Sequence, residues 1–109
     1  MPNPPCTLEY YLDDHGEAPF ICWLEGLRDR AARARIAVRL DRVRLGNFGQ
    51  VKALGDGVSE LKIDYGPGYR VYFAMRGQTL VLLLIGGDKA TQARDIRMAK
   101  SYWQQEKEA

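Results

Sequence analysis

The run LVLLLI, residues 80–85, is the feature that most limits how this 109-residue chain can fold. Every side chain in it is apolar, so a strand formed from it presents an apolar surface on both faces. We therefore expect a central strand that is covered on both sides. The run is far shorter than the roughly 20 apolar residues of a membrane-spanning helix. The N-terminal segment MPNPPCTLEYY does not have the pattern of a signal peptide, so we expect a cytoplasmic protein that contacts no membrane.

Three other segments alternate apolar and polar residues, the pattern of a strand with one buried face. Residues 58–65, VSELKIDY, and 69–76, YRVYFAMR, are joined by the turn GPG. A second turn, GQT, leads into the apolar run, so a three-strand antiparallel meander is predicted. A separate N-terminal strand is predicted at TLEYYLDD, residues 7–14, with its buried face formed by Leu8, Tyr10 and Leu12.

Helical periodicity marks the remaining segments. Pro19 suits the first turn of a short helix, and a second helix is predicted over residues 30–45. A third begins near Gln92, followed by a solvated tail at residues 104–109. The chain is thus predicted to form one α+β domain over residues 1–109, with an N-terminal strand, a helical hairpin, a three-strand antiparallel meander and a C-terminal helix.

Positive charge is concentrated in the second predicted helix. The whole chain has a net charge of +2, whereas residues 28–44 contain seven arginines and two aspartates. Arg35, Arg39 and Arg42 share one side of that helix and are candidate RNA-binding residues. A patch this basic attracts either phosphates or an acidic protein segment, and a merely solubilising face is the third interpretation.

The two cysteines, Cys6 and Cys22, form no CxxC motif and no cluster with histidine. We interpret them as two reduced thiols. The sequence contains no pattern typical of a zinc site, and we expect neither a metal nor another cofactor.

Alternation places several polar side chains on one face of the hairpin that surrounds the GPG turn. Lys62 and Arg70 are predicted to lie side by side, near Tyr72, on a face exposed to solvent. Lys89 follows the next strand, beside the same face. The candidate site residues in this region are Lys62, Arg70, Tyr72, Arg76, Asp88 and Lys89.

Such a cluster has the groups that metal-free RNA cleavage needs. The ribose 2′-oxygen must lose a proton, and the phosphorane then gains negative charge, which Arg70 could stabilise. The amine of Lys62 or of Lys89 could remove the proton, with Glu60 and Asp88 as the next candidates. Tyr72 could stack on a base. The ordinary alternative is a solvated sheet face with mixed charges.

The combination of ELKIDYGPGYRVYF with GGDK and a closing helix through KSYW resembles the RelE/ParE superfamily of bacterial toxins, specifically its HigB-like addiction module killer group. The resemblance spans nearly the whole chain and implies a RelE-like fold. It implies a type II toxin that cleaves mRNA on the ribosome without a metal. A cognate antitoxin is the implied partner, and operator DNA would be contacted only through it.

By position, Arg70 matches the arginine after the turn in this superfamily, and Lys62 and Lys89 match basic positions on either side of it. Glu60 and Asp95 depart from the pattern, because some relatives have a lysine and a tyrosine there. Two other functions therefore stay open. One is a ParE-like poison of DNA gyrase, and the other is an inactive relative that only binds its antitoxin.

Overall fold

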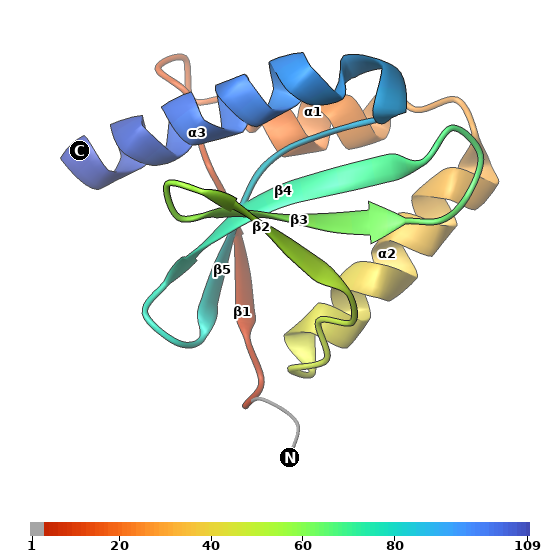
Figure 1. Cartoon of the computed structure of the whole chain (residues 1–109), viewed down its shortest axis with the longest axis horizontal. Helices are drawn as coiled ribbons and strands as arrows, with labels where there is room; N and C mark the ends of the chain where they lie inside the picture. The colour runs from red at the N-terminus through yellow and green to blue at the C-terminus, as the bar shows by residue number, and fades with distance from the viewer. Residues whose placement is uncertain (1–3) are drawn as a thin grey trace.

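The computed structural model describes residues 4–109, so the first three residues of the expected domain lie outside the description. The elements of the described part form one five-stranded sheet and three α-helices, which confirms the α+β prediction (Figure 1). In chain order they are β1 (Thr7–Tyr10), α1 (Pro19–Glu25), α2 (Arg30–Arg44), β2 (Val51–Gly55), β3 (Val58–Ile63), β4 (Tyr69–Arg76), β5 (Leu80–Gly87), the 3₁₀ turn η1 (Lys89–Thr91) and α3 (Gln92–Glu108).

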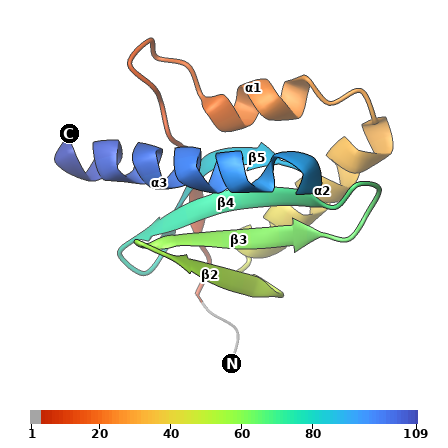
Figure 2. The same cartoon turned by 45° about the horizontal axis from the view of Figure 1, so that its top comes forward.

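The strands lie in the order β1-β5-β4-β3-β2. β1 runs parallel to β5, and the other neighbours are antiparallel. The predicted three-strand meander lacked one strand. β2 pairs with β3 as well and forms one edge of the sheet (Figure 2). The turn between them, Asp56–Gly57, has positive φ at both residues, as a type I′ hairpin requires. Most of β2 is exposed, so no apolar alternation marks it in the sequence.

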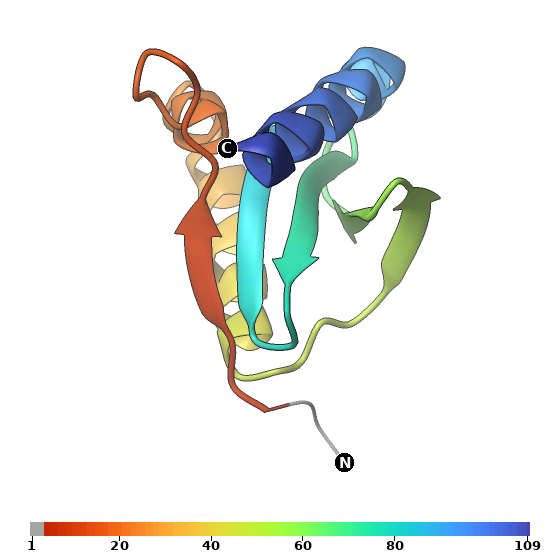
Figure 3. The same ribbon diagram turned by 90° about the vertical axis from the view of Figure 1, so that its left-hand side faces the viewer.

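Helices cover both faces of the sheet, and this arrangement produces two apolar cores. One core joins α1 and α2 to the sheet through residues such as Phe20, Ile36 and Phe73. The other lies beneath α3, where Ala99 and Trp103 pack against the opposite face. Figure 3 shows α3 and the α1–α2 pair on opposite sides of the sheet. The prediction for residues 80–85 is confirmed, since β5 is buried from Val81 onward.

The predicted buried face of the N-terminal strand was wrong at Tyr10 and Leu12, although Leu8 is half-buried and packs against the core. Tyr10 and Leu12 are exposed, whereas Tyr11 is buried. The strand ends at Tyr10, and the Tyr11 ring then turns beneath α3, where it stacks on Tyr102 with 4.7 Å between ring centroids. Its hydroxyl donates a hydrogen bond to Gln105 Oε1. The packing of this segment against α3 decides which of its side chains are buried. Alternation within one strand does not indicate that packing.

The predicted solvated tail at residues 104–109 is helical through Glu108. Its Gln, Glu and Lys residues are good helix formers, and most of them are exposed. Glu106 fixes this last turn to the sheet, because its carboxylate pairs with Arg76 at the end of β4. No helix in the described range 4–109 is long and apolar enough to cross a membrane.

Two glycines at the end of β5 allow both helical layers to approach the sheet closely. A Cβ atom built on Gly86 would lie 2.1 Å from the Trp23 ring of α1. One built on Gly87 would lie 1.8 Å from Asp95 Oδ2 of α3. Real Cβ atoms do not approach other atoms so closely, so any larger residue forces these groups apart. Gly86 therefore lets α1 lie close to the end of β5, and Gly87 does the same for the first turn of α3.

Candidate functional site

The pairing of β3 with β4 places the predicted site residues in register. Lys62 lies opposite Arg70, and Glu60 lies opposite Tyr72. The side-by-side arrangement of Lys62 and Arg70 predicted from the GPG turn is therefore confirmed.

The prediction that this sheet face is exposed to solvent was wrong. Tyr72 is fully buried, and Glu60 and Arg70 are 5% and 6% exposed. The first turns of α3 cover them and contribute Asp95, which is also buried. The alternation of apolar and polar residues predicts which side chains share a face of the sheet. It does not predict whether a helix covers that face. Lys62, which lies nearer the GPG turn than Glu60 does, stays exposed.

Beneath α3, Arg70 and Glu60 form a buried ion pair. Arg70 Nε lies 3.4 Å from Glu60 Oε1, and Arg70 Nη1 donates a hydrogen bond of 2.6 Å to the Gly68 carbonyl. Gln92 Nε2 donates to the same Glu60 oxygen at 3.1 Å. Arg70 Nε makes no hydrogen bond of ordinary geometry within the described chain, although it is buried. The guanidinium is thus held from two sides and is largely buried.

Tyr72 and Asp95 lie deeper in the same cluster. The Asp95 carboxylate accepts a hydrogen bond from Thr91 Oγ1 and contacts the Arg94 guanidinium at 3.5 Å. Burial, and then the negative charges of Glu60 and Asp95, raise the pKa of Tyr72 well above its usual range. Its hydroxyl has no hydrogen-bond partner among residues 4–109. With its ring fully buried, Tyr72 cannot stack on a base in this conformation.

A cavity of about 380 Å³ lies at the GPG end of the hairpin, and it brings together three of the predicted cations. Lys62 comes from β3, Arg70 from β4 and Lys89 from η1. Gly68 has a φ of 79°, a backbone conformation that favours glycine, and its carbonyl accepts the hydrogen bond from Arg70 Nη1. The lining residues are Lys62, Asp64, Tyr65, Gly66, Pro67, Gly68, Arg70 and Lys89.

Two other predicted site residues have different positions. The Asp88 carboxylate accepts hydrogen bonds from the backbone N–H groups of Ala90 and Thr91, so it caps η1 and orders the turn that contains Lys89. Arg76 lies six residues beyond Arg70 along β4, about 20 Å away at the usual rise of a strand. It pairs with Glu106 and does not join the cavity.

The α2 arginines divide into different roles. Arg39 donates to three backbone carbonyls, at Lys62, Phe48 and Gln50, and so holds the loop before β2 against β3. The Arg35 guanidinium lies 4.5 Å from the centre of the Tyr65 ring. Arg42 is exposed. All three line a groove of about 480 Å³ that shares Asp64 with the smaller cavity.

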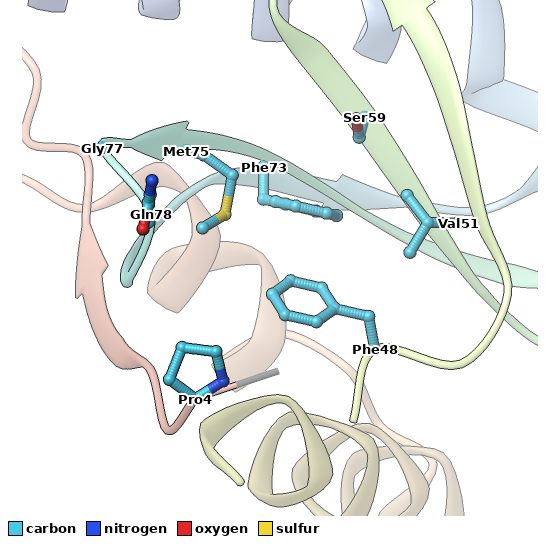
Figure 4. Close-up of a pocket in the computed structure, with 8 residues that line it drawn as sticks. All are labelled: Pro4, Phe48, Val51, Ser59, Phe73, Met75, Gly77 and Gln78. Atoms are coloured by element: carbon cyan, nitrogen blue, oxygen red, sulfur yellow. The ribbon is translucent and has the colours of Figure 1, made fainter. Parts of the chain in front are cut away.

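Figure 4 shows another cavity, of about 550 Å³, on the α2 side of the sheet. Phe48 and Phe73 face each other across it, with their ring centroids 5.8 Å apart. Its lining is uncharged and includes no group suited to acid–base chemistry. The lining residues are Pro4, Phe48, Val51, Ser59, Phe73, Met75, Gly77 and Gln78. Within the part of the chain that the structure describes, no group of three or more His, Cys, Asp or Glu side chains could hold a metal ion.

Comparison with known sequences places this chain in a family. The model of the family described as Phage derived protein Gp49-like (DUF891) matches residues 23–103, and the chain belongs to that family. The family is associated with toxins of type II toxin–antitoxin modules, which implies an antitoxin as a partner. An uncharacterised protein of Haemophilus influenzae (strain ATCC 51907 / DSM 11121 / KW20 / Rd) is 49% identical over 81 residues, which cover 74% of this chain and 82% of that protein.

Sequence reasoning missed two parts of this site. Tyr65 lines the cavity, and Gln92 supports Glu60 from α3. The alternation placed Tyr65 with the apolar set of its strand, but β3 ends at Ile63 and the chain then turns. Only the packing of α3 on the sheet brings Gln92 to Glu60, so no local pattern could have indicated that contact.

Replacement of Arg70 by alanine should destabilise the fold strongly, because Glu60 would be left as a buried charge without its cation. We expect Arg70→Ala to lower the free energy of unfolding by about 3–5 kcal/mol in chemical denaturation. The double variant Arg70→Met/Glu60→Leu should recover most of that loss, since it removes both charges. A change within about 0.5 kcal/mol for Arg70→Ala, as at an exposed position, would show that the pair is not buried in solution.

Removal of the Tyr72 hydroxyl should leave stability nearly unchanged at neutral pH, because that group is buried without a partner. We expect Tyr72→Phe to stay within about 0.5 kcal/mol of the parent, whereas Tyr11→Phe, which loses the bond to Gln105, should cost about 0.5–1.5 kcal/mol. Each variant removes one tyrosine hydroxyl oxygen and nothing else, so each serves as the control for the other. Equal losses would contradict the account.

The raised pKa of Tyr72 adds a dependence on pH. Unfolded tyrosine ionises near pH 10, while the folded residue keeps its proton, so stability is present below about pH 10 and falls as the pH rises further. Tyr72→Phe should reduce the slope of this fall in alkaline denaturation. Part of the slope should remain, because burial also raises the pKa values of Tyr11, Tyr69 and Tyr102.

Proposed function

We propose that this protein is the toxin of a type II toxin–antitoxin system and that it cleaves mRNA on the ribosome without a catalytic metal. The proposal places it among the HigB-like members of the RelE/ParE superfamily, with a RelE-like arrangement of its elements. The observation that carries it is the cavity at the GPG turn, where Lys62, Arg70 and Lys89 come together from three separate elements. The family's association with such toxins supports the same conclusion.

Arg70 stabilises the charge of the phosphorane in this proposal. Its guanidinium presents several N–H donors, and Glu60 and the Gly68 carbonyl fix its position before substrate binds. A donor that is already oriented in a poorly hydrated site stabilises developing charge more strongly than one in water. The burial that overturned the prediction of an exposed arginine therefore favours this role.

Lys62 or Lys89 removes the proton from the ribose 2′-hydroxyl, and the 2′-oxygen then bonds to phosphorus. The bond between phosphorus and the 5′-oxygen breaks, and that oxygen takes a proton from the other lysine or from water at the exposed rim. Both amines belong to exposed residues at the rim of the cavity, and Lys62 contacts Asp64 at 3.3 Å. Glu60 is bound to both Arg70 and Gln92, so we assign it to positioning Arg70. Asp88 likewise acts by capping the turn that contains Lys89. Tyr65, half-buried in the cavity wall, takes the base-stacking role that the sequence suggested for Tyr72.

The test compares cleavage of mRNA on programmed ribosomes by three single variants. We expect Lys62→Met or Lys89→Met to slow cleavage by about 100-fold or more, because general-base catalysis contributes at least that much. Arg70→Lys keeps the buried charge but removes the planar set of N–H donors, so its cleavage rate should also fall by about 100-fold. Lys107→Met, at the exposed end of α3, is the matched control. Parental rates in all three test variants would overturn the assignment.

The gyrase alternative gives a different result in cells. Induction of the parent chain should produce mapped breaks in mRNA and no gyrase-dependent breaks in DNA. DNA breaks with intact mRNA would instead establish the ParE-like function. Absence of both, with the antitoxin still bound, would identify an inactive relative.

A further inference from the structure

Helix α2 has a second apolar stripe on the side that faces away from the sheet. Its buried stripe, which includes Ile36 and Leu40, packs in the core. The second stripe has the spacing of a helix that pairs with another helix, with intervals of three, four and seven residues. Its members are Ala31, Ala34, Val38 and Leu45. Val38 is 50% exposed and Leu45 is 72% exposed, so the stripe leaves a row of apolar side chains open to solvent along one side of the helix.

Three members of the stripe form the floor of a groove along α2, and Leu45 lies beyond it, at the C-terminal end of the helix. Ala31, Ala34 and Val38 line it from the helix, and Ile63 at the end of β3 lines the other side. Small side chains at two of the helical positions would let another helix approach closely, since the distance between packed helices depends on the side chains at their contact.

Charge determines which helix fits this groove. Arg35 and Arg42 border the stripe, and the segment from residue 28 to residue 44 has a net charge of +5. A second copy of this chain would bring a helix of the same charge and would be repelled. RNA would match the charge, but an aliphatic floor offers it no hydrogen bonds, and Arg39 already donates to three backbone carbonyls.

We propose that the outer face of α2 is a docking site for an acidic amphipathic helix of a partner protein. Apolar side chains of the partner helix enter the groove over Val38, and its carboxylates pair with Arg35 and Arg42. Identification of this partner with the antitoxin rests on the proposed function, whereas the surface itself does not.

Fluorescence anisotropy with a synthetic peptide tests the proposal. The probe is a peptide of about three heptads with Leu at positions a and d and Glu at positions e and g, which is an acidic helix with one apolar face. The control peptide has Lys in place of each Glu. We expect the parent chain to bind the acidic peptide at least about tenfold more tightly than the basic one, and binding to weaken as salt is added.

Val38→Glu and Leu45→Glu should each weaken binding of the acidic peptide by about tenfold or more. Both positions are exposed, so thermal unfolding should confirm that the fold is intact. Leu12→Glu changes another exposed leucine, away from α2, and should bind the peptide as the parent does. Unchanged binding by the two α2 variants, or equal affinity of the parent for the acidic and basic peptides, would overturn the proposal.

Binding of a labelled single-stranded RNA oligonucleotide tests the alternative that RNA, and not a protein helix, occupies the groove. We expect Val38→Glu to bind it with the parental affinity. If the substitution weakens RNA binding and spares the peptide, the groove belongs to RNA and the proposal fails. Since the peptide measurement contains no ribosomes and requires no cleavage, its outcome is independent of whether the chain is a nuclease.

Discussion

The ion pair between Glu60 and Arg70 determines how the candidate site is built. Arginine keeps its charge when buried, so its position beneath α3 requires a nearby carboxylate. Glu60 supplies it from the next strand at 3.4 Å, and Gln92 joins the same oxygen to the start of α3. Gly87 at the end of β5 leaves room for the Asp95 side chain. One buried pair thus connects the GPG hairpin with the helix that covers it, and η1, which contains Lys89, lies between them.

Two of the concave basic surfaces within residues 4–109 differ in their chemistry. The cavity at the GPG turn combines lysine amines with a fixed guanidinium, which suits a reaction at phosphate. The groove on α2 combines an apolar floor with arginines at its edge, which suits a protein helix. Asp64 lines both, so a helix docked on α2 would lie next to the entrance of the cavity. In the proposed function, binding of a partner there would also obstruct access of RNA.

The sequence predicts those parts of the fold that depend on local spacing. Apolar periodicity identified β5, α1 and the core face of α2, and the GPG turn was sufficient to pair Lys62 with Arg70. β2 was missed because an exposed edge strand needs no apolar face. Burial of Glu60, Arg70 and Tyr72 was missed for a different reason, since it depends on where α3 crosses the sheet. The cationic residues of the site could therefore be predicted from the sequence. The burial of Arg70 and its ion pair with Glu60 could not.

A double-mutant cycle on single-turnover cleavage tests most directly whether the Glu60–Arg70 pair serves catalysis. Glu60→Gln keeps the shape of the side chain and removes its charge, and Arg70→Lys changes the guanidinium that it positions. If Glu60 acts through Arg70, Glu60→Gln should slow cleavage of ribosome-bound mRNA in the parent but have little further effect in the Arg70→Lys background. Equal slowing in both backgrounds, or no cleavage by the parent chain, would contradict this account.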